Sequence, residues 1–275
     1  MRRRFAQVDV FTAEPLLGNP VAVVLDADDL STEDMAALAR WTNLSETTFV
    51  LAPEDPGADY RVRIFTPVLE LPFAGHPTLG TAHAWLEAGG VPAVAGRVVQ
   101  ECGVGLVELR QGERLAFAAP PLKRSGPAED DLVARIADLL SLPVDALVAV
   151  EWVDNGPGWV AALLADADAV LAARPAFAEI DLGLVGLHPE GSPQAIEVRG
   201  FFPKDGTLVE DPVTGSLNAS LAQWLLGSGR LTAPYVAAQG TALGRAGRIH
   251  VDQDAAGTVW VGGDTVTVVG GHLDL

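Results

Sequence analysis

The sequence contains one cysteine and two lysines, and both scarcities exclude classes of protein. With Cys102 alone, the chain cannot form an internal disulfide or a zinc site built from cysteines. Neither Lys123 nor Lys204 stands in a G-x-x-x-x-G-K phosphate loop, and we find no G-x-G-x-x-G after a strand, no H-E-x-x-H and no G-x-S-x-G. These gaps disfavour a nucleotide-dependent enzyme, a zinc protease and an α/β-hydrolase.

Positive charge is also scarce, with 18 basic against 36 acidic residues among 275, a formal net charge of −18. Such a surface repels phosphate backbones, so nucleic acid is not an expected partner. The longest uncharged segment, Pro212–Gly229, contains too many polar residues for a membrane-spanning helix. Asp9 and Glu14 interrupt what would be the apolar core of a signal peptide. We therefore expect a cytoplasmic protein that does not contact membranes.

Apolar periodicity, bounded by glycine and proline, predicts a mixture of strands and helices. The first helix is expected to follow Ser31, which precedes two acidic residues suited to a first turn. Further helices are predicted at 77–88, 130–140 and 213–226. Strands are predicted at 5–11, 20–25, 47–52, 60–66, 97–101, 105–110, 114–119, 146–152, 158–164 and 195–202, with short ones between 235 and 269. Pro120–Pro127 is the best candidate for a linker.

A weak internal repeat has a period near half the chain length. Arg63–Pro67 matches Arg199–Pro203 at an offset of 136, and His76–Thr81 matches Asp211–Ser216 at an offset of 135. In both copies a predicted strand ends at Phe-x-Pro, a loop follows, and a helix rich in small residues begins. A period this long favours two similar lobes over a solenoid.

The two helix starts are candidates for anion binding, because a helix N-terminus exposes unpaired N–H groups and partial positive charge. Facing each other across a cleft between the lobes, they would hold a small carboxylate. His76 and Asp211 add a proton-transferring group to each loop, and Glu46 precedes an apolar strand. A raised pKa in an apolar cleft would make Glu46 a usable acid or base. The alternative is that the small residues only cap helices and that Glu46 is a surface carboxylate.

Four segments together resemble the phenazine biosynthesis PhzF-like family. They lie in the family's order and span most of the chain: Glu14–Val23 (EPLLGNPVAV), Asn43–Val50 (NLSETTFV), Arg63–Ala82 (RIFTPVLELPFAGHPTLGTA) and Glu210–Ser216 (EDPVTGS). The resemblance implies an α+β diaminopimelate-epimerase-like fold. Its two pseudosymmetric lobes are each a curled, mostly antiparallel sheet around a central helix. We expect the N-terminal lobe at 1–119, completed by a strand at 265–275, and the C-terminal lobe at 120–264.

The resemblance also implies the chemistry. In the phenazine enzyme, the residue matching Glu46 transfers a proton during isomerisation of trans-2,3-dihydro-3-hydroxyanthranilate, without metal or organic cofactor. His76 and Asp211 match further catalytic positions. The positions that match substrate contacts are Gly75, Gly215 and Ser216, with Ser45 as an additional one. A homodimer is expected on the same ground.

One difference from the family pattern bears on the identity of the substrate and not on the catalytic residues. As implied by the resemblance, phenazine-pathway members carry small residues directly after the aspartate, whereas Pro212 and Val213 follow Asp211 here. The expectation is therefore a cofactor-independent isomerase acting on a small carboxylated metabolite. Two alternatives stay open: epimerisation of an unusual amino acid by carboxylate and imidazole, and a non-catalytic protein that binds a small ligand.

Overall fold

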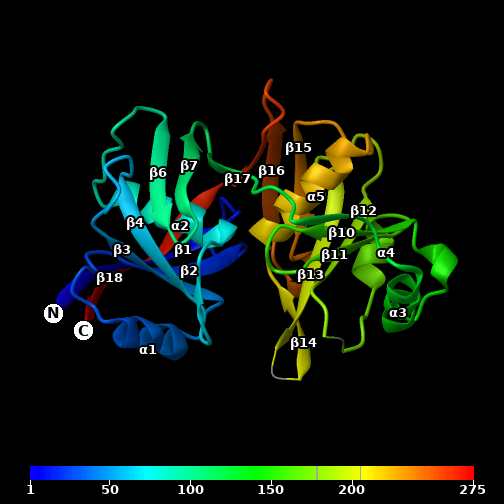
Figure 1. Cartoon of the computed structure of the whole chain (residues 1–275), viewed down its shortest axis with the longest axis horizontal. Helices are drawn as coiled ribbons and strands as arrows, with labels where there is room; N and C mark the ends of the chain where they lie inside the picture. The colour runs from blue at the N-terminus through cyan, green and yellow to red at the C-terminus, as the bar shows by residue number, and fades with distance from the viewer. Residues whose placement is uncertain (178, 205) are drawn as a thin grey trace. The chain divides into compact units, whose positions relative to one another are not determined.

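Strands outnumber helices in the computed structural model, which describes residues 1–177, 179–204 and 206–275. The chain forms two units (Figure 1). Unit 1 contains Met1–Ala118 and Gly262–Leu275, and unit 2 contains Ala119–Val261. Within the described residues, no helix combines the length and the apolar character that crossing a membrane requires.

In unit 1, β1 is the strand on which the two ends of the chain meet. β1 pairs antiparallel with both β2 and β18, so the C-terminal strand completes the N-terminal sheet (Figure 1). The bounds in this unit are β1 Arg2–Val10, β2 Asn19–Val24, α1 Thr32–Thr42, β3 Glu46–Leu51, β4 Tyr60–Phe65, β5 Glu70–Leu71, α2 Gly75–Glu87, β6 Arg97–Cys102, β7 Gly105–Gln111, β8 Leu115–Ala118 and β18 Thr265–Asp274.

Helix α2 is the centre of unit 1 and contacts β1, β2, β3 and β8. Its residues from Gly75 to Ala82 are all buried, which is the pattern of a helix enclosed by its own sheet. Small residues permit this close packing: a Cβ on Gly80 would lie 2.4 Å from Val21 Cγ1. The glycine and threonine pattern of α2 is therefore a packing requirement.

Unit 2 repeats this plan with one additional outer α-helix, α3. Its elements are β9 Arg124–Pro127, α3 Asp130–Leu140, η1 Val144–Ala146, β10 Ala149–Asp154, β11 Val160–Leu163, α4 Ala167–Ala172, β12 Leu182–Leu187, β13 Ile196–Lys204, β14 Thr207–Asp211, α5 Gly215–Gly227, β15 Tyr235–Gln239, η2 Thr241–Leu243, β16 Gly247–Gln253 and β17 Val259–Gly263, which extends to the first residues of the return to unit 1. Half of the expected linker is strand β9, because its residues pair antiparallel with β10.

The same order of strand pairing occurs in both units. β2 and β3 are parallel across α1, β3 and β4 antiparallel, β4 and β5 antiparallel, and β4 and β6 parallel across α2. β11, β12, β13, β14 and β15, with α4 and α5, follow the identical sequence of pairings. The weak repeat in the sequence thus corresponds to a repeated topology.

One part of the sequence repeat is wrong in register. The match of His76 with Asp211 placed the two central helices at an offset of 135, whereas α2 begins at Gly75 and α5 at Gly215, an offset of 140. His76 therefore corresponds to Ser216. The offset changes because the strands of the hairpin β13–β14 are longer than those of β4–β5: Gly200 pairs with Asp211, whereas its counterpart Ile64 pairs with Leu71.

Strand β12 was missed in the sequence because glycine interrupts its apolar pattern. Gly183 lies beneath Leu217 of α5, and a Cβ there would come within 2.6 Å of Leu217 Cδ1. A Cβ on Gly186 would lie 2.1 Å from the Asp166 carbonyl oxygen at the start of α4. Both glycines therefore let a helix approach the sheet closely, one on each face.

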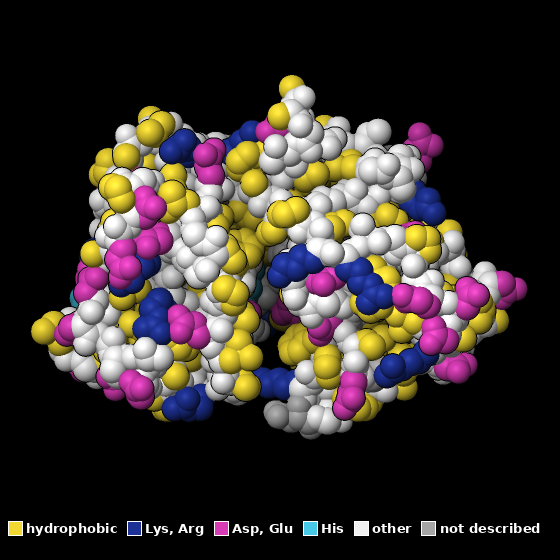
Figure 2. All heavy atoms as spheres, viewed as in Figure 1, with side chains coloured by type: hydrophobic (Ala, Val, Ile, Leu, Met, Phe, Trp, Pro, Cys, Tyr) yellow, Lys and Arg dark blue, Asp and Glu magenta, His cyan; other side chains and the backbone are white. Residues whose placement is uncertain are grey.

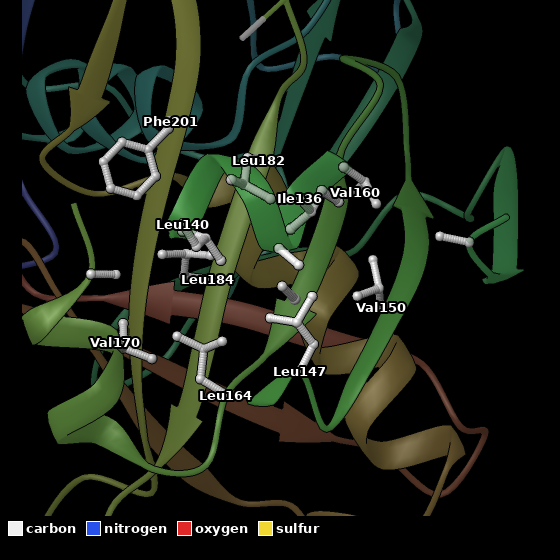
Figure 3. Close-up of a cluster of buried hydrophobic side chains, with 14 residues drawn as sticks. Ile136, Leu140, Leu147, Val150, Val160, Leu164, Val170, Leu182, Leu184 and Phe201 are labelled. Atoms are coloured by element: carbon white, nitrogen blue, oxygen red, sulfur yellow. The ribbon is translucent and has the colours of Figure 1, made fainter. Parts of the chain in front are cut away.

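A hydrophobic core of unit 2 lies between its sheet and helices α3 and α4 (Figure 3). Ile136 and Leu140 of α3 and Val170 of α4 pack on Leu182, Leu184 and Phe201 of the sheet. The opposite face of α3 is exposed, and Figure 2 shows acidic side chains gathered where it lies; they include Glu129, Asp130, Asp131 and Asp138.

We predict that Gly186→Ala destabilises the protein, because its Cβ would collide with backbone atoms that cannot rotate away. The free energy of unfolding should fall by about 3 kcal/mol. Gly227→Ala is the matched control at the end of α5, where a Cβ would have open space, and it should stay within about 1 kcal/mol of wild type. Urea unfolding followed by circular dichroism measures both; equal midpoints would refute the packing argument.

Candidate active site

Glu46 and His76 come together in unit 1. Glu46 is the first residue of β3, and the parallel register places it opposite Val21 of β2. His76 is the second residue of α2. Nδ1 of His76 and Oε2 of Glu46 are 3.3 Å apart, and the two side chains are 6% and 16% exposed. Two of the three expected catalytic side chains are thus direct neighbours at the junction of a strand and the central helix.

Burial sets the ionisation of His76. Removal from water lowers the pKa of its imidazole from the usual 6.5 to about 4, and a hydrogen bond to the backbone of Pro20 only partly opposes this. At neutral pH the imidazole is therefore uncharged, and its contact with Glu46 is not an ion pair. Nε2 of His76 is also buried and has no hydrogen-bond partner within the described part of the chain. That nitrogen can serve a bound molecule.

The loop that brings Pro20 to His76 is held by strained and close-packed backbone. Phe11 and Leu16 adopt positive φ angles of 66° and 73°. Gly18 donates its N–H to Oδ2 of the buried Asp9 at 3.0 Å, and a Cβ on Gly18 would lie 2.2 Å from the Val10 carbonyl oxygen. Only glycine fits there, which explains why the turn before Pro20 carries one.

The first turns of α2 and α5 both lack a side-chain cap. Ala74 at the N-cap of α2 offers no side-chain acceptor, and Thr214 at the N-cap of α5 makes no capping hydrogen bond with its own helix among the described residues. Gly75 and Gly215 are the first residues of these helices. Backbone N–H groups at a helix start without a side-chain cap suit a carboxylate or phosphate ligand.

In unit 2, Asp211 is the last residue of β14 and is partly buried. Its Oδ2 accepts a hydrogen bond of 2.7 Å from Oγ1 of Thr214. The fully buried Gln239 stabilises this turn: its Nε2 donates to Thr214 Oγ1 at 2.9 Å, and its Oε1 accepts from the Thr214 N–H at 3.0 Å. Asn218 Nδ2 donates to the same Gln239 oxygen at 2.7 Å. Asp211 is therefore fixed relative to the start of α5.

Ser216 is held from a different direction by the loop after β10. Trp159 Nε1 donates to Ser216 Oγ at 3.1 Å, and Asn155 Nδ2 donates to the Ser216 carbonyl oxygen at 2.9 Å. Oδ1 of Asn155 is buried and has no partner among the residues that the structure describes. Ser45, the additional expected contact, is exposed directly before β3.

Sequence reasoning named Glu46, His76 and Asp211 as candidates but did not name the residues that contact them. Gln239 ends an apolar strand and Trp159 directly precedes one, so neither stands out by type or spacing. In the described chain, no group of three or more histidine, cysteine or acidic side chains is arranged to hold a metal ion.

Comparison with known proteins shows similarity to phenazine biosynthesis-like proteins. Residues 8–271 match the family model PhzC-PhzF, described as phenazine biosynthesis-like protein. The trans-2,3-dihydro-3-hydroxyanthranilate isomerase of Pseudomonas aeruginosa is 37% identical, over 92% of this chain and 91% of its own. The Schizosaccharomyces pombe protein named antisense-enhancing sequence 1 is also 37% identical, over 97% of both chains.

A solved structure gives the fold. The Bacillus anthracis phenazine biosynthesis protein of the PhzF family superposes with a TM-score of 0.82 at 23% identity, over 100% of both chains. The expected diaminopimelate-epimerase-like fold is thereby confirmed.

We predict that His76 makes the fold acid-sensitive. Its pKa is about 4 when folded and 6.5 when exposed, so between these values the unfolded chain binds the proton more readily. The free energy of unfolding should therefore be highest above pH 6.5, as far as His76 is concerned, and should fall by about 3 kcal/mol as pH falls to about 4. His76→Asn should lack this part of the pH dependence in urea unfolding.

His272→Asn, on an exposed position of β18, is the control and should keep the wild-type pH dependence. If both variants and the wild type show the same change between pH 7 and pH 4, His76 is not buried in the neutral form.

Proposed function

The chain belongs to the PhzC-PhzF family of phenazine biosynthesis-like proteins and is an isomerase, and from this premise we propose a reaction. In the proposed reaction, the enzyme moves a proton between carbons of a small carboxylated metabolite by general acid–base catalysis, without a metal or organic cofactor. The contact between Glu46 and His76 at 3.3 Å is the single observation that supports this most strongly.

Proton abstraction is the role that suits Glu46. The Glu46 side chain is 16% exposed and lies beside a neutral imidazole, so little water surrounds its carboxylate. A carboxylate in such surroundings can take a proton from carbon. His76 cannot donate an imidazolium proton at neutral pH, because burial lowers its pKa to about 4. Its Nε2 instead orients the substrate through a hydrogen bond, while Nδ1 contacts Glu46.

The remaining expected residues bind and orient the substrate. Gly75 begins α2, and Gly215 and Ser216 begin α5; neither helix start has a side-chain cap, so each suits an anionic or polar group. Asp211, held by Thr214, accepts a hydrogen bond from a hydroxyl or amino group. These assignments follow the family resemblance and the local geometry of each unit.

The reaction conserves every atom of the substrate. Glu46 removes a proton from an acidified carbon, the electron pair moves through the adjacent double bond, and a proton is added at the far carbon. The relative from Pseudomonas aeruginosa carries the name of such an isomerase, acting on trans-2,3-dihydro-3-hydroxyanthranilate. Because Pro212 and Val213 follow Asp211, we propose this compound as a test substrate and the wider class of small carboxylates as the true one. A homodimer is part of the proposal, and sedimentation velocity tests it.

We predict that Glu46→Gln lowers the rate of isomerisation by at least about 100-fold, because the amide cannot take a proton. Incubation with trans-2,3-dihydro-3-hydroxyanthranilate in deuterated buffer, followed by mass spectrometry, measures conversion and deuterium uptake together. Glu54→Gln is the matched control: Glu54 is an exposed carboxylate in the same unit, paired with Arg61, and its loss should leave the rate unchanged.

Full activity of Glu46→Gln would contradict the proposed mechanism. Deuterium incorporation with inversion at one carbon, instead of a shift between two, would establish epimerisation as the reaction.

A further inference from the structure

A chain of two buried hydroxyl groups joins helix α2 to strands β3 and β2 of unit 1. Oγ1 of Thr81 in α2 donates to Oγ1 of Thr48 in β3 at 2.8 Å, and Thr48 Oγ1 donates to the Ala22 carbonyl oxygen of β2 at 3.3 Å. All three residues are fully buried. Each hydroxyl group has one proton and a carbonyl oxygen can only accept, so the direction of both hydrogen bonds is fixed.

The same three elements carry the groups around His76. Helix α2 carries His76 itself, β3 begins with Glu46, and β2 contains Pro20, whose backbone acts on the imidazole. Side chains alternate between the two faces of a strand, so Glu46 and Thr48 share the face of β3 that meets α2.

The hydroxyl chain lies close enough to His76 to control its position. Thr81 follows His76 by five residues in the same helix, which is about 7.5 Å along the helix axis. Glu46 and Thr48 are likewise two residues apart in one strand. A shift of α2 along β3 that separates His76 from Glu46 therefore has to stretch the hydrogen bond between Thr81 and Thr48 as well.

Unit 2 makes the corresponding contact between helix and sheet without hydroxyl groups. Ile64 and Gly200 occupy the same place in the repeat, and they lie opposite Thr48 and Gly183, respectively. Gly183 is thus the counterpart of Thr48. A Cβ on Gly183 would lie 2.6 Å from Leu217 Cδ1, so unit 2 packs its central helix here by apolar contact.

The helix position differs between the units in the same way. Thr81 is the seventh residue of α2, and the seventh residue of α5 is Leu221, which is fully buried. Threonine is the poorer helix former of the two, because branching at Cβ restricts its side chain. The shared topology therefore requires a hydroxyl group at neither position, and unit 1 has the pair for another reason.

We propose that Thr81 and Thr48 are positioning residues for the isomerisation: their hydrogen bond fixes the first turns of α2 against β3 and so keeps His76 in contact with Glu46. Both threonines act through that pair and do not touch the substrate. As far as the reaction is concerned, the inference rests on the proposed function. The placement of His76 is a property of the folded protein, and it can be measured without a substrate.

A second pair of threonines provides the matched control. Oγ1 of Thr42, the last residue of α1, and Oγ1 of Thr47 are 2.9 Å apart. Thr47 lies on the face of β3 opposite to that of Glu46 and Thr48, so this hydrogen bond joins the strand to α1. Thr42→Val removes a hydrogen bond of the same type from the same strand, and it should leave His76 in place.

The first experiment measures His76 without a substrate. Nitrogen-15 NMR of the histidine-labelled protein should show that Thr81→Val raises the pKa of His76 above the wild-type value of about 4, because a displaced α2 admits water to the ring. Thr48→Val removes the acceptor and should act alike. Thr81→Ser keeps the hydroxyl group and should restore most of the wild-type titration, while Thr42→Val should titrate like wild type.

Urea unfolding at neutral pH establishes that each variant is folded. If one of the two valine variants at positions 48 and 81 does not fold, the other decides. A wild-type titration of His76 in the folded valine variants would overturn the proposal. An equal rise of the His76 pKa in Thr42→Val would also overturn it, because the effect would then follow from loss of stability alone.

The second experiment measures the conversion of trans-2,3-dihydro-3-hydroxyanthranilate. Displacement of a catalytic group affects the transition state more than substrate binding, so Thr81→Val should lower kcat by about 10-fold and leave KM within about twofold. Thr81→Ser should recover most of the loss, and Thr42→Val should have the wild-type kcat. Thr81→Val combined with Thr48→Val should lower kcat no further than Thr48→Val alone, because both remove the same hydrogen bond.

The failures of the two proposals are distinguishable. If Thr81→Val and Thr48→Val keep the wild-type kcat while Glu46→Gln is inactive, the inference fails and the proposed function stands. Additive losses in the double variant would contradict a single shared connection. If wild type neither converts the substrate nor takes up deuterium, the proposed function itself fails, and the titration of His76 still decides whether the two threonines hold it.

Discussion

The burial of an imidazole against a carboxyl group is the constraint on which unit 1 depends. His76 occupies the first turn of a helix enclosed on most sides by strands, and its pKa falls to about 4 for that reason. The strained loop ending at Pro20, the glycine at position 18 and the small residues of α2 all serve this enclosure. The packing that stabilises the unit is thus the packing that keeps His76 neutral beside Glu46.

Duplication gives the second unit the same frame with different chemistry. Both units share the strand pairings, the central helix and an ion pair between arginine and glutamate. The residue types at the candidate functional positions differ between the units. His76 is matched by Ser216, the second residue of the corresponding helix. Asp211 is matched by Leu71 of unit 1, because Leu71 and Asp211 close equivalent hairpins on β4 and β13. The fold therefore permits the two halves of the chain to bring different functional groups to equivalent positions.

The sequence predicted most of the fold, and the structure brings two of its candidate site residues, Glu46 and His76, together. Helices 77–88 and 213–226 were correct within about two residues, because their apolar and small residues are continuous. Strand β12 was missed because Gly183 and Gly186 interrupt its apolar pattern. Both positions require glycine because helices distant in sequence pack against them.

The state of His76 is the most direct test of this account. Nitrogen-15 NMR of the histidine-labelled protein, with the His76 signals assigned by His76→Asn, reports the protonation of each ring nitrogen as pH falls. The account predicts a neutral imidazole that protonates only near pH 4. An imidazole that titrates near 6.5 would show a solvated His76 and would contradict the buried pair with Glu46.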